Sequence, residues 1–301
     1  MTEPLPLDEV TARLQAHIET LKRPAWKPLV EPIEDSDEPS LRTTSTFCGP
    51  PYLAPGEDWP RCECGQPLQL FLQLDLTALP GPLVGKHGGG LLQVFYHHLP
   101  LEKPDGGECY GEPGWEPFDE SSKLVRVVHP GGEPQNDSFD PDANRNNKDE
   151  FPPLRIVGWT KVEDSPSYDE TGIDVEYGFR GGRKSVACPA IGLQRDIGPG
   201  DKVDGASYES WLFEEQFDES GNLAGDAPLG RPHDGDKLGG WPAWVQGVEY
   251  PKCIECGEPM DMLFQIDSED NVPDMFGDCG TAHVTQCPTH PDVVAMGWAC
   301  G

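Results

Sequence analysis

Residues 59–75 have the sequence WPRCECGQPLQLFLQLD, and residues 250–267 repeat its pattern as YPKCIECGEPMDMLFQID. The two strings align when the Cys-Gly pair at Cys64 is placed on the one at Cys256. The remaining matches, the first two across a one-residue gap, are Pro60 with Pro251, Cys62 with Cys253, Pro67 with Pro259, Gln73 with Gln265, and Asp75 with Asp267. Two copies of so particular a string are hard to obtain by chance, so the sequence predicts an internally duplicated unit.

Each copy continues into a predicted strand. In residues 68–76 leucine occupies every second position, which places the leucines on one face of the strand. The 35 Gly and 33 Pro residues disfavour long helices. One amphipathic helix is predicted over residues 7–22, where apolar side chains recur at helical spacing. Further strands are predicted at 91–97, 123–128, 154–162, 281–287 and 292–300.

These patterns predict an α+β fold that is rich in strands and internally duplicated into two halves. An N-terminal helix and an acidic linker are expected in residues 1–40, the first half in residues 41–190, and the second half in residues 191–301. The polar stretch 129–153 has too few apolar residues to bury, so we expect a surface loop there.

The composition bears on possible partners. The chain has 22 Lys and Arg against 53 Asp and Glu, a formal net charge of −31. Such a surface repels nucleic-acid phosphates and anionic membranes and attracts basic proteins. Alternatively, the charge serves only solubility in a host whose proteome is acidic. Because no apolar run approaches the ~20 residues of a membrane span and the start lacks a secretory pattern, we expect a soluble cytoplasmic protein with a basic protein partner.

The second half carries a strong metal-site pattern. Cys253-x2-Cys256 is followed by Cys287-x2-His290, the two-knuckle spacing of a zinc ribbon. Thiolate sulfur and imidazole nitrogen suit tetrahedral zinc. The alternative is four unrelated side chains.

The first half carries a looser version of this pattern. Its donors are Cys62, Cys64, His97 or His98, and Cys109. Sliding the repeat places His97 opposite Cys287, and Cys109 would close a site of three cysteines and one histidine. The alternative is that this half has lost its metal and packs without it. With both sites filled, each half contains a zinc-knuckle element and the chain holds two Zn²⁺ ions.

Both predicted sites are closed four-ligand sets, which favours a structural role over catalysis. The sequence has no nucleophile elbow, phosphate-binding loop, zinc-protease motif or dinucleotide fingerprint, so no catalytic residue is assigned. The repeated Gln and Asp of each strand have two possible roles: they line a polar pocket for a bound peptide, or they satisfy loop backbone groups. The second role is the commoner one for buried Gln and Asp, and we expect it here.

Four segments together resemble the YwqG-like family of bacterial proteins, also called DUF1963. They are GEDWPRCECGQPLQLFLQLDL at 56–76, KLGGWPAWVQ at 237–246, CGEPMDMLFQIDSED at 256–270 and FGDCGTAHVTQCPTHP at 276–291. The resemblance covers roughly residues 40–301, with departures at Cys48 and Pro50. It implies a β-rich, duplicated α+β fold with pseudo-symmetric halves.

The resemblance also suggests functions. The family is similar to the programmed-cell-death-two-like proteins, which act as chaperones for a newly made ribosomal protein, and some bacterial members are proposed immunity proteins beside toxin genes. Our leading hypothesis is a non-enzymatic protein-binding module, such as an immunity protein that neutralises a basic toxin. One alternative is a chaperone for a newly made basic protein. Another is a zinc enzyme with an open ligand position in the first site.

Overall fold

The protein is described by a computed structural model, and some stretches of the chain fall outside that description. The described residues are 5–33, 41–97, 101–102, 108–109, 114–131, 151–176, 184–197, 202–203, 206–207, 216–217, 223–225 and 230–301. His98, most of the predicted loop at 129–153 and most of the acidic linker lie outside them.

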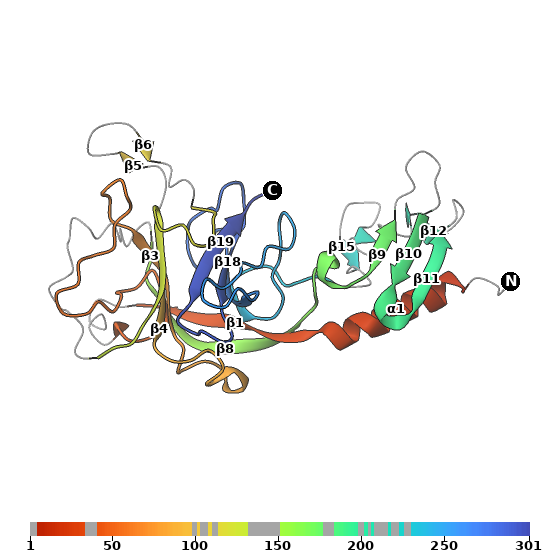
Figure 1. The fold of residues 1–301 in the computed structure, drawn as a ribbon, viewed down its shortest axis with the longest axis horizontal. Coiled ribbons are helices and arrows are strands. Elements are labelled where there is room, and N and C mark those ends of the chain that lie inside the picture. Colours follow the sequence, from red (N-terminus) through yellow and green to blue (C-terminus); the bar gives the residue numbers. More distant parts are fainter. Residues whose placement is uncertain are drawn as a thin grey trace. The chain divides into compact units, whose positions relative to one another are not determined.

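Ten strands form one sheet, in the order β19-β18-β17-β16-β1-β8-β2-β3-β4-β7. Figure 1 labels β1, β3, β4, β8, β18 and β19 of this sheet. Their bounds are β1 (Arg23–Pro32), β2 (Thr46–Phe47), β3 (Gln69–Asp75), β4 (Leu91–Tyr96), β7 (Lys123–Val128), β8 (Leu154–Asp164), β16 (Lys237–Gly239), β17 (Asp261–Asp267), β18 (Thr281–Gln286) and β19 (Val294–Ala299). The two end strands of this order, β7 and β19, contact each other, so the sheet is nearly closed.

The segment 114–117 links these two end strands. The buried ammonium of Lys123, in β7, donates hydrogen bonds to two carbonyls of this segment. On its other side, the N–H groups of Met296 and Trp298, in β19, donate to two further carbonyls of the segment at 3.2 and 3.4 Å. Burial lowers the pKa of Lys123 to about 8. Backbone and side chain therefore both hold the sheet near closure.

The two ends of the sheet follow the same plan. Outward from the central pair β1 and β8, one end runs β2-β3-β4-β7 and the other runs β16-β17-β18-β19. The β3–β4 pair shifts register between Leu70 and Leu72, and the β17–β18 pair shifts between Met262 and Phe264. Aligning Cys64 with Cys256 superimposes these two bulges in the sequence.

The bulge corrects one prediction about the leucines of residues 68–76. A bulge adds a residue to one strand and changes which face the following side chains occupy. Leu68 and Leu70 accordingly pack in one cluster with Trp59, whereas Leu72, Leu74 and Leu76 pack in the main core. Alternate leucines therefore do not share a single face along the whole strand.

The main core consists of apolar side chains that come from both ends of the sheet. Phe47 lies 6.0 Å from Phe264, and Phe71 lies 6.1 Å from Phe276, measured between ring centroids. Aromatic pairs at these separations add to the burial of apolar area. All four rings are at most 1% exposed.

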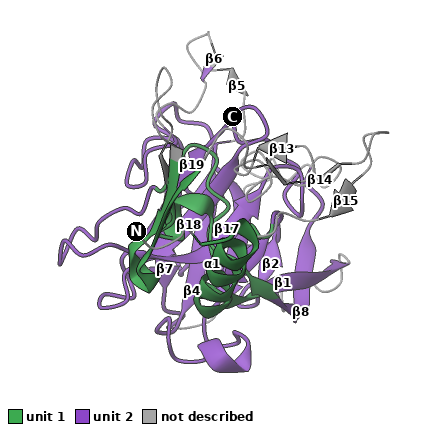
Figure 2. Ribbon diagram, turned by 90° about the vertical axis from the view of Figure 1, so that its right-hand side faces the viewer, with its two compact units in different colours: residues 1–25, 163–233, 240–248 green, residues 26–162, 234–239, 249–301 purple. Residues whose placement is uncertain are grey.

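The chain divides into two compact units, coloured separately in Figure 2. Unit 1 consists of residues 1–25, 163–233 and 240–248, and unit 2 consists of residues 26–162, 234–239 and 249–301. Unit 2 contains both copies of the repeat. The predicted boundaries after residues 40 and 190 follow the sequence repeat and stay a prediction.

Unit 1 contains α1 (Leu7–Leu21), the predicted amphipathic helix. It packs against the three-stranded sheet β11-β10-β9 through Val10, Leu14 and Ile18. The helix ends where Lys22 adopts an extended backbone.

The elements of both units whose bounds are not given above are short. They are β5 (Leu101–Glu102), β6 (Glu108–Cys109), β9 (Asp174–Glu176), β10 (Lys184–Cys188), β11 (Leu193–Ile197), β12 (Lys202–Val203), β13 (Ala206–Ser207), β14 (Gln216–Phe217), β15 (Leu223–Gly225), and the short 3-10 helices η2 (Gly81–Leu83), η3 (Tyr168–Glu170) and η4 (Pro189–Ile191).

The described part of the chain contains no helix that is both long enough and apolar enough to cross a membrane.

Candidate metal centres

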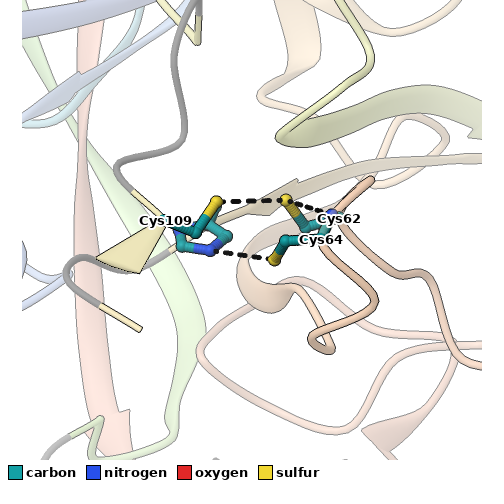
Figure 3. Close-up of side chains that lie close together, drawn as sticks. Cys62, Cys64 and Cys109 are labelled. Atoms are coloured by element: carbon teal, nitrogen blue, oxygen red, sulfur yellow. Dashed lines mark hydrogen bonds between the residues drawn. The ribbon is translucent and has the colours of Figure 1, made fainter. Parts of the chain in front are cut away.

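The first candidate centre gathers Cys62, Cys64, His97 and Cys109. The sulfur atoms of Cys62 and Cys109, both labelled in Figure 3, lie 3.9 Å apart. The sulfur of Cys64 lies 3.7 Å from Nε2 of His97. Cys62 and His97 are buried, whereas Cys64 and Cys109 are half-buried. The ligand atoms all lie within 4.8 Å of one another, so one ion could contact all four residues.

The second candidate centre gathers Cys253, Cys256, Cys287 and His290. The sulfurs of Cys256 and Cys287 are 3.7 Å apart, and Nδ1 of His290 lies 3.6 Å from the sulfur of Cys253 and 3.7 Å from that of Cys287. Here too the four ligand atoms lie within 4.8 Å of one another. The ring nitrogen that faces the sulfurs is Nδ1 in His290 and Nε2 in His97.

Both cysteine turns are built by the same local structure. The bridges Arg61↔Pro67 and Lys252↔Pro259 close the base of each turn. At the tips, the N–H of Cys64 points to the sulfur of Cys62 at 3.5 Å, and the N–H of Glu255 points to the sulfur of Cys253 at 3.4 Å. Hydrogen bonds to sulfur favour the thiolate, the form that binds a metal.

One glycine in each turn has a backbone that other residues rarely adopt. Gly65 and Gly257 have φ angles of 85° and 74°, and both lie just after the cysteine pair. A side chain at such a φ angle is disfavoured, so glycine is the residue that permits the tight turn.

The interatomic distances fit tetrahedral zinc. With Zn–S bonds of about 2.3 Å, the edge between two sulfur ligands of a tetrahedron is about 3.8 Å. The sulfur pairs at 3.9 and 3.7 Å match that edge and are far longer than a disulfide bond. The donor set of three cysteines and one histidine is also one that zinc prefers.

Each centre contains one thiol whose pKa is raised and one whose pKa is lowered. In the second centre, burial acts to raise the pKa of Cys253, but N–H groups of Cys256 and Glu255 and neighbouring side chains lower that pKa to about 6. In the first centre, burial raises the pKa of Cys62 to about 12. Burial acts to raise the pKa of Cys64 in the first centre, but the N–H of Gln66 and the neighbouring thiols lower it. In the second centre, the N–H of Glu258 acts to lower the pKa of Cys256, but burial and the neighbouring thiols raise it. Because a metal binds the thiolate, each centre must release a proton on binding, from Cys62 in the first and from Cys256 in the second.

All eight residues predicted as ligands are thus brought together, four to a centre. The structure places His97 in the first centre, and His98 lies outside the described residues. Whether these residues bind zinc stays a prediction.

The repeated glutamines beside the centres satisfy backbone groups. The side chain of Gln73 accepts a hydrogen bond from the N–H of Tyr52 at 2.8 Å and donates to the carbonyls of Arg42 and Thr44 at 3.1 and 2.9 Å. Gln265 donates to the carbonyl of Gly235 at 2.9 Å. These bonds support the structural interpretation over a peptide-binding pocket.

A family model described as "Domain of unknown function (DUF1963)" matches residues 45–285, which is most of the chain. The chain belongs to the DUF1963 family. The match spans the whole first centre and the first cysteine pair of the second, and it ends just before Cys287. A comparison with curated proteins gave no match.

Proposed function

We propose that this DUF1963 protein is a non-enzymatic protein-binding module whose two metal centres hold structural zinc. The observation that carries the proposal is that each centre offers four protein ligand atoms within 4.8 Å of one another. Four protein ligands complete the tetrahedral shell of zinc and leave no position for substrate or activated water. Bound zinc would cross-link distant parts of the chain, and its binding free energy would then contribute to folding.

The proposed partner is a basic protein, such as a toxin domain neutralised by an immunity protein. The net charge of −31 supports this partner class, because opposite charges speed association and suppress like-charged competitors. Such attraction weakens as salt screens it, over a Debye length of about 8 Å at physiological ionic strength.

A pull-down from the native host at low and moderate salt tests the binding role. A tagged, zinc-loaded chain should retain a stoichiometric basic protein at low salt and lose most of it as salt rises. A cognate partner that binds equally well at both salt concentrations would contradict the electrostatic basis of the proposal. A bait that retains no partner would contradict the binding role itself.

The second candidate, a chaperone for a newly made basic protein, rests on the resemblance to the programmed-cell-death-two-like chaperones. This candidate also uses the acidic charge of the chain, but the bound partner would be a newly made protein instead of a toxin. The same pull-down separates the two: a nascent or ribosome-associated protein supports chaperoning, and a secreted or toxin-like domain supports immunity.

A zinc enzyme is the third candidate, and the first centre is the place to test it. Its Cys62-x-Cys64 spacing departs from the two-residue spacing of Cys253 and Cys256, so it is the centre in which a water could replace a protein ligand. Zinc-edge absorption spectroscopy on a Cys253→Ala variant isolates this centre. Three sulfurs and one nitrogen support the structural role, whereas an additional or replacing oxygen supports catalysis.

We also propose that the two ends of the sheet descend from a duplicated unit. Support comes from the repeated cysteine turns, the repeated strand order and the two bulges at aligned positions. An experimental structure tests this: β2-β3-β4-β7 should superpose on β16-β17-β18-β19 with Cys62 on Cys253. A superposition that needs a different residue alignment would contradict duplication.

A further inference from the structure

Gln286 is the last residue of β18 and directly precedes the candidate ligand Cys287. Its side chain is buried, with 4% of its surface exposed. On the other side of the knuckle, Pro291 directly follows the candidate ligand His290. A contact made by Gln286 or Pro291 is therefore one residue away from the metal centre.

One amide group joins this knuckle to the loop before β4. Nε2 of Gln286 donates to the carbonyl of Pro291 at 2.7 Å and to the carbonyl of His87 at 3.1 Å. With both N–H groups of the amide used, Oε1 is the acceptor, and it lies 2.7 Å from Nδ1 of His87. His87 therefore donates through Nδ1–H. Burial lowers the pKa of this histidine, which is consistent with a neutral ring at this contact.

The loop also fits the knuckle closely. A Cβ atom added at Gly88 would lie only 2.9 Å from Cβ of Pro291, closer than side chains normally approach. In addition, Nε2 of His129 lies 2.9 Å from Oδ1 of Asp292, although both side chains are well exposed and the pair adds little. The amide bonds and the close packing at Gly88 are therefore the main contacts.

These contacts join opposite ends of the sheet. Residues 87 and 88 lie between β3 and β4, whereas Gln286 and Pro291 flank the turn from β18 to β19. The two regions are far apart in the strand order and meet where the sheet nearly closes.

We infer that metal binding at the second centre is coupled to docking of residues 87–88, with Gln286 as the positioning residue. The inference rests on the proposed zinc site. Metal fixes Cys287 and His290, and thereby places Gln286 and the Pro291 carbonyl where the loop can bind. By linkage, the docked loop strengthens metal binding by the same factor as metal strengthens docking.

The first centre has a related contact of different chemistry. Tyr96 directly precedes the candidate ligand His97, as Gln286 precedes Cys287. The Tyr96 ring packs edge-on against Phe276, from the loop between β17 and β18, at 5.6 Å. Each centre is thus contacted by a loop from the opposite end of the sheet, through a polar link at the second and an apolar one at the first.

Two glycine substitutions in the same loop test the coupling in the full-length, zinc-loaded protein. Gly88→Ala introduces the clash with Pro291, whereas Gly85→Ala adds the same methyl group where nothing lies within 4 Å. Their φ angles, 71° and 77°, impose nearly the same backbone strain. Comparing these two variants therefore distinguishes the effect of lost docking from the effect of replacing a glycine in this loop.

The readouts are zinc release to a chromogenic chelator and amide hydrogen exchange over residues 81–92. Zinc release from the second centre is identified as the kinetic phase that the wild type shows and the Cys256→Ala variant lacks. Gly88→Ala and Gln286→Leu should accelerate that phase by about tenfold, within the usual range of coupling, and speed exchange in the loop. Gly85→Ala should match the wild type.

Equal zinc release from Gly88→Ala and Gly85→Ala, with Gln286→Leu unchanged, would overturn the coupling while leaving the zinc site intact. Wild-type protein that holds no zinc at the second centre would instead overturn the proposed function and the coupling with it. The zinc content of the wild type, measured first, distinguishes these failures.

Discussion

The two candidate metal centres have the same donors but different surroundings. The first is backed by a sizeable apolar cluster that contains Leu53, Trp59, Leu68, Leu70 and Phe95. Among the described residues, the corresponding cluster around the second centre contains Met260 and Ala295 besides two of the candidate ligands, with Val293 partly buried against it. Burial of large apolar side chains is the main stabilising contribution to a core. We therefore propose that metal binding contributes more to stability in the second half than in the first.

The largest effect should follow loss of a ligand in the second centre. We expect Cys253→Ala to remove one zinc per chain and to destabilise unit 2 by about 4–5 kcal/mol, because little apolar packing surrounds this centre. Calorimetry should show a melting temperature lower by roughly 10 °C or more. Cys279→Ala, an exposed cysteine outside both centres, is the control and should retain wild-type zinc and melting.

The equivalent change in the first centre should cost less. Cys62→Ala should also release one zinc, but the apolar cluster remains, so we expect a loss of about 3 kcal/mol. Side-by-side unfolding curves of the two variants measure the difference. A larger loss for Cys62→Ala than for Cys253→Ala would reverse the comparison.

A third effect concerns the glutamine network of the first half. Besides its bonds to loop backbone, Oε1 of Gln73 accepts a hydrogen bond from Nε2 of Gln93 at 2.9 Å. Gln73→Leu would leave several buried polar groups unsatisfied, and we expect destabilisation of about 2–3 kcal/mol with both zinc ions retained. Gln194→Leu, at an exposed position of β11, is the control and should have little effect on the denaturant midpoint.

The smallest expected effect concerns Asp236, which accepts the same backbone hydrogen bond in the second half that Ser45 accepts in the first. The N–H of Asp75 donates to Ser45 at 2.9 Å, and the N–H of Asp267 donates to Asp236 at 2.8 Å, so equivalent strands use different acceptors. Burial, together with Asp270, raises the pKa of Asp236 from 3.8 to about 7. The folded state therefore holds a proton that the unfolded state has released.

Protonation of Asp236 therefore stabilises the folded state. This contribution to the free energy of unfolding is fully present below about pH 4 and is lost as the pH rises through about 7. Between pH 5 and pH 7, Asp236 should lower the free energy of unfolding by about 2 kcal/mol. Asp236→Ser introduces the acceptor of the first half and should remove this share of the pH dependence. The test measures denaturant unfolding of the wild type and of Asp236→Ser at each pH. Titration of the metal ligands affects both proteins equally and cancels in the comparison. Parallel pH profiles would show that Asp236 does not titrate in this range.

The repeated string predicted β3 and β17 and supplied four of the eight candidate ligands, because cysteine spacing and alternating leucines are local signals. The other four candidates came from the Cys287-x2-His290 pair and from the donors that follow the first copy. The bulge at Leu70 was not predictable in this way, since the extra residue depends on pairing with β4. The link through Gln286 was also missed: its only signal in the sequence is its position before Cys287. Its partners, His87 and Pro291, are defined by how opposite ends of the sheet meet.

Zinc content together with zinc-edge absorption of the wild-type chain tests whether both centres are closed zinc sites. We expect two zinc ions per chain, each bound by three sulfurs and one nitrogen. A single zinc ion per chain or none, or an average shell that contains oxygen, would contradict two closed structural centres.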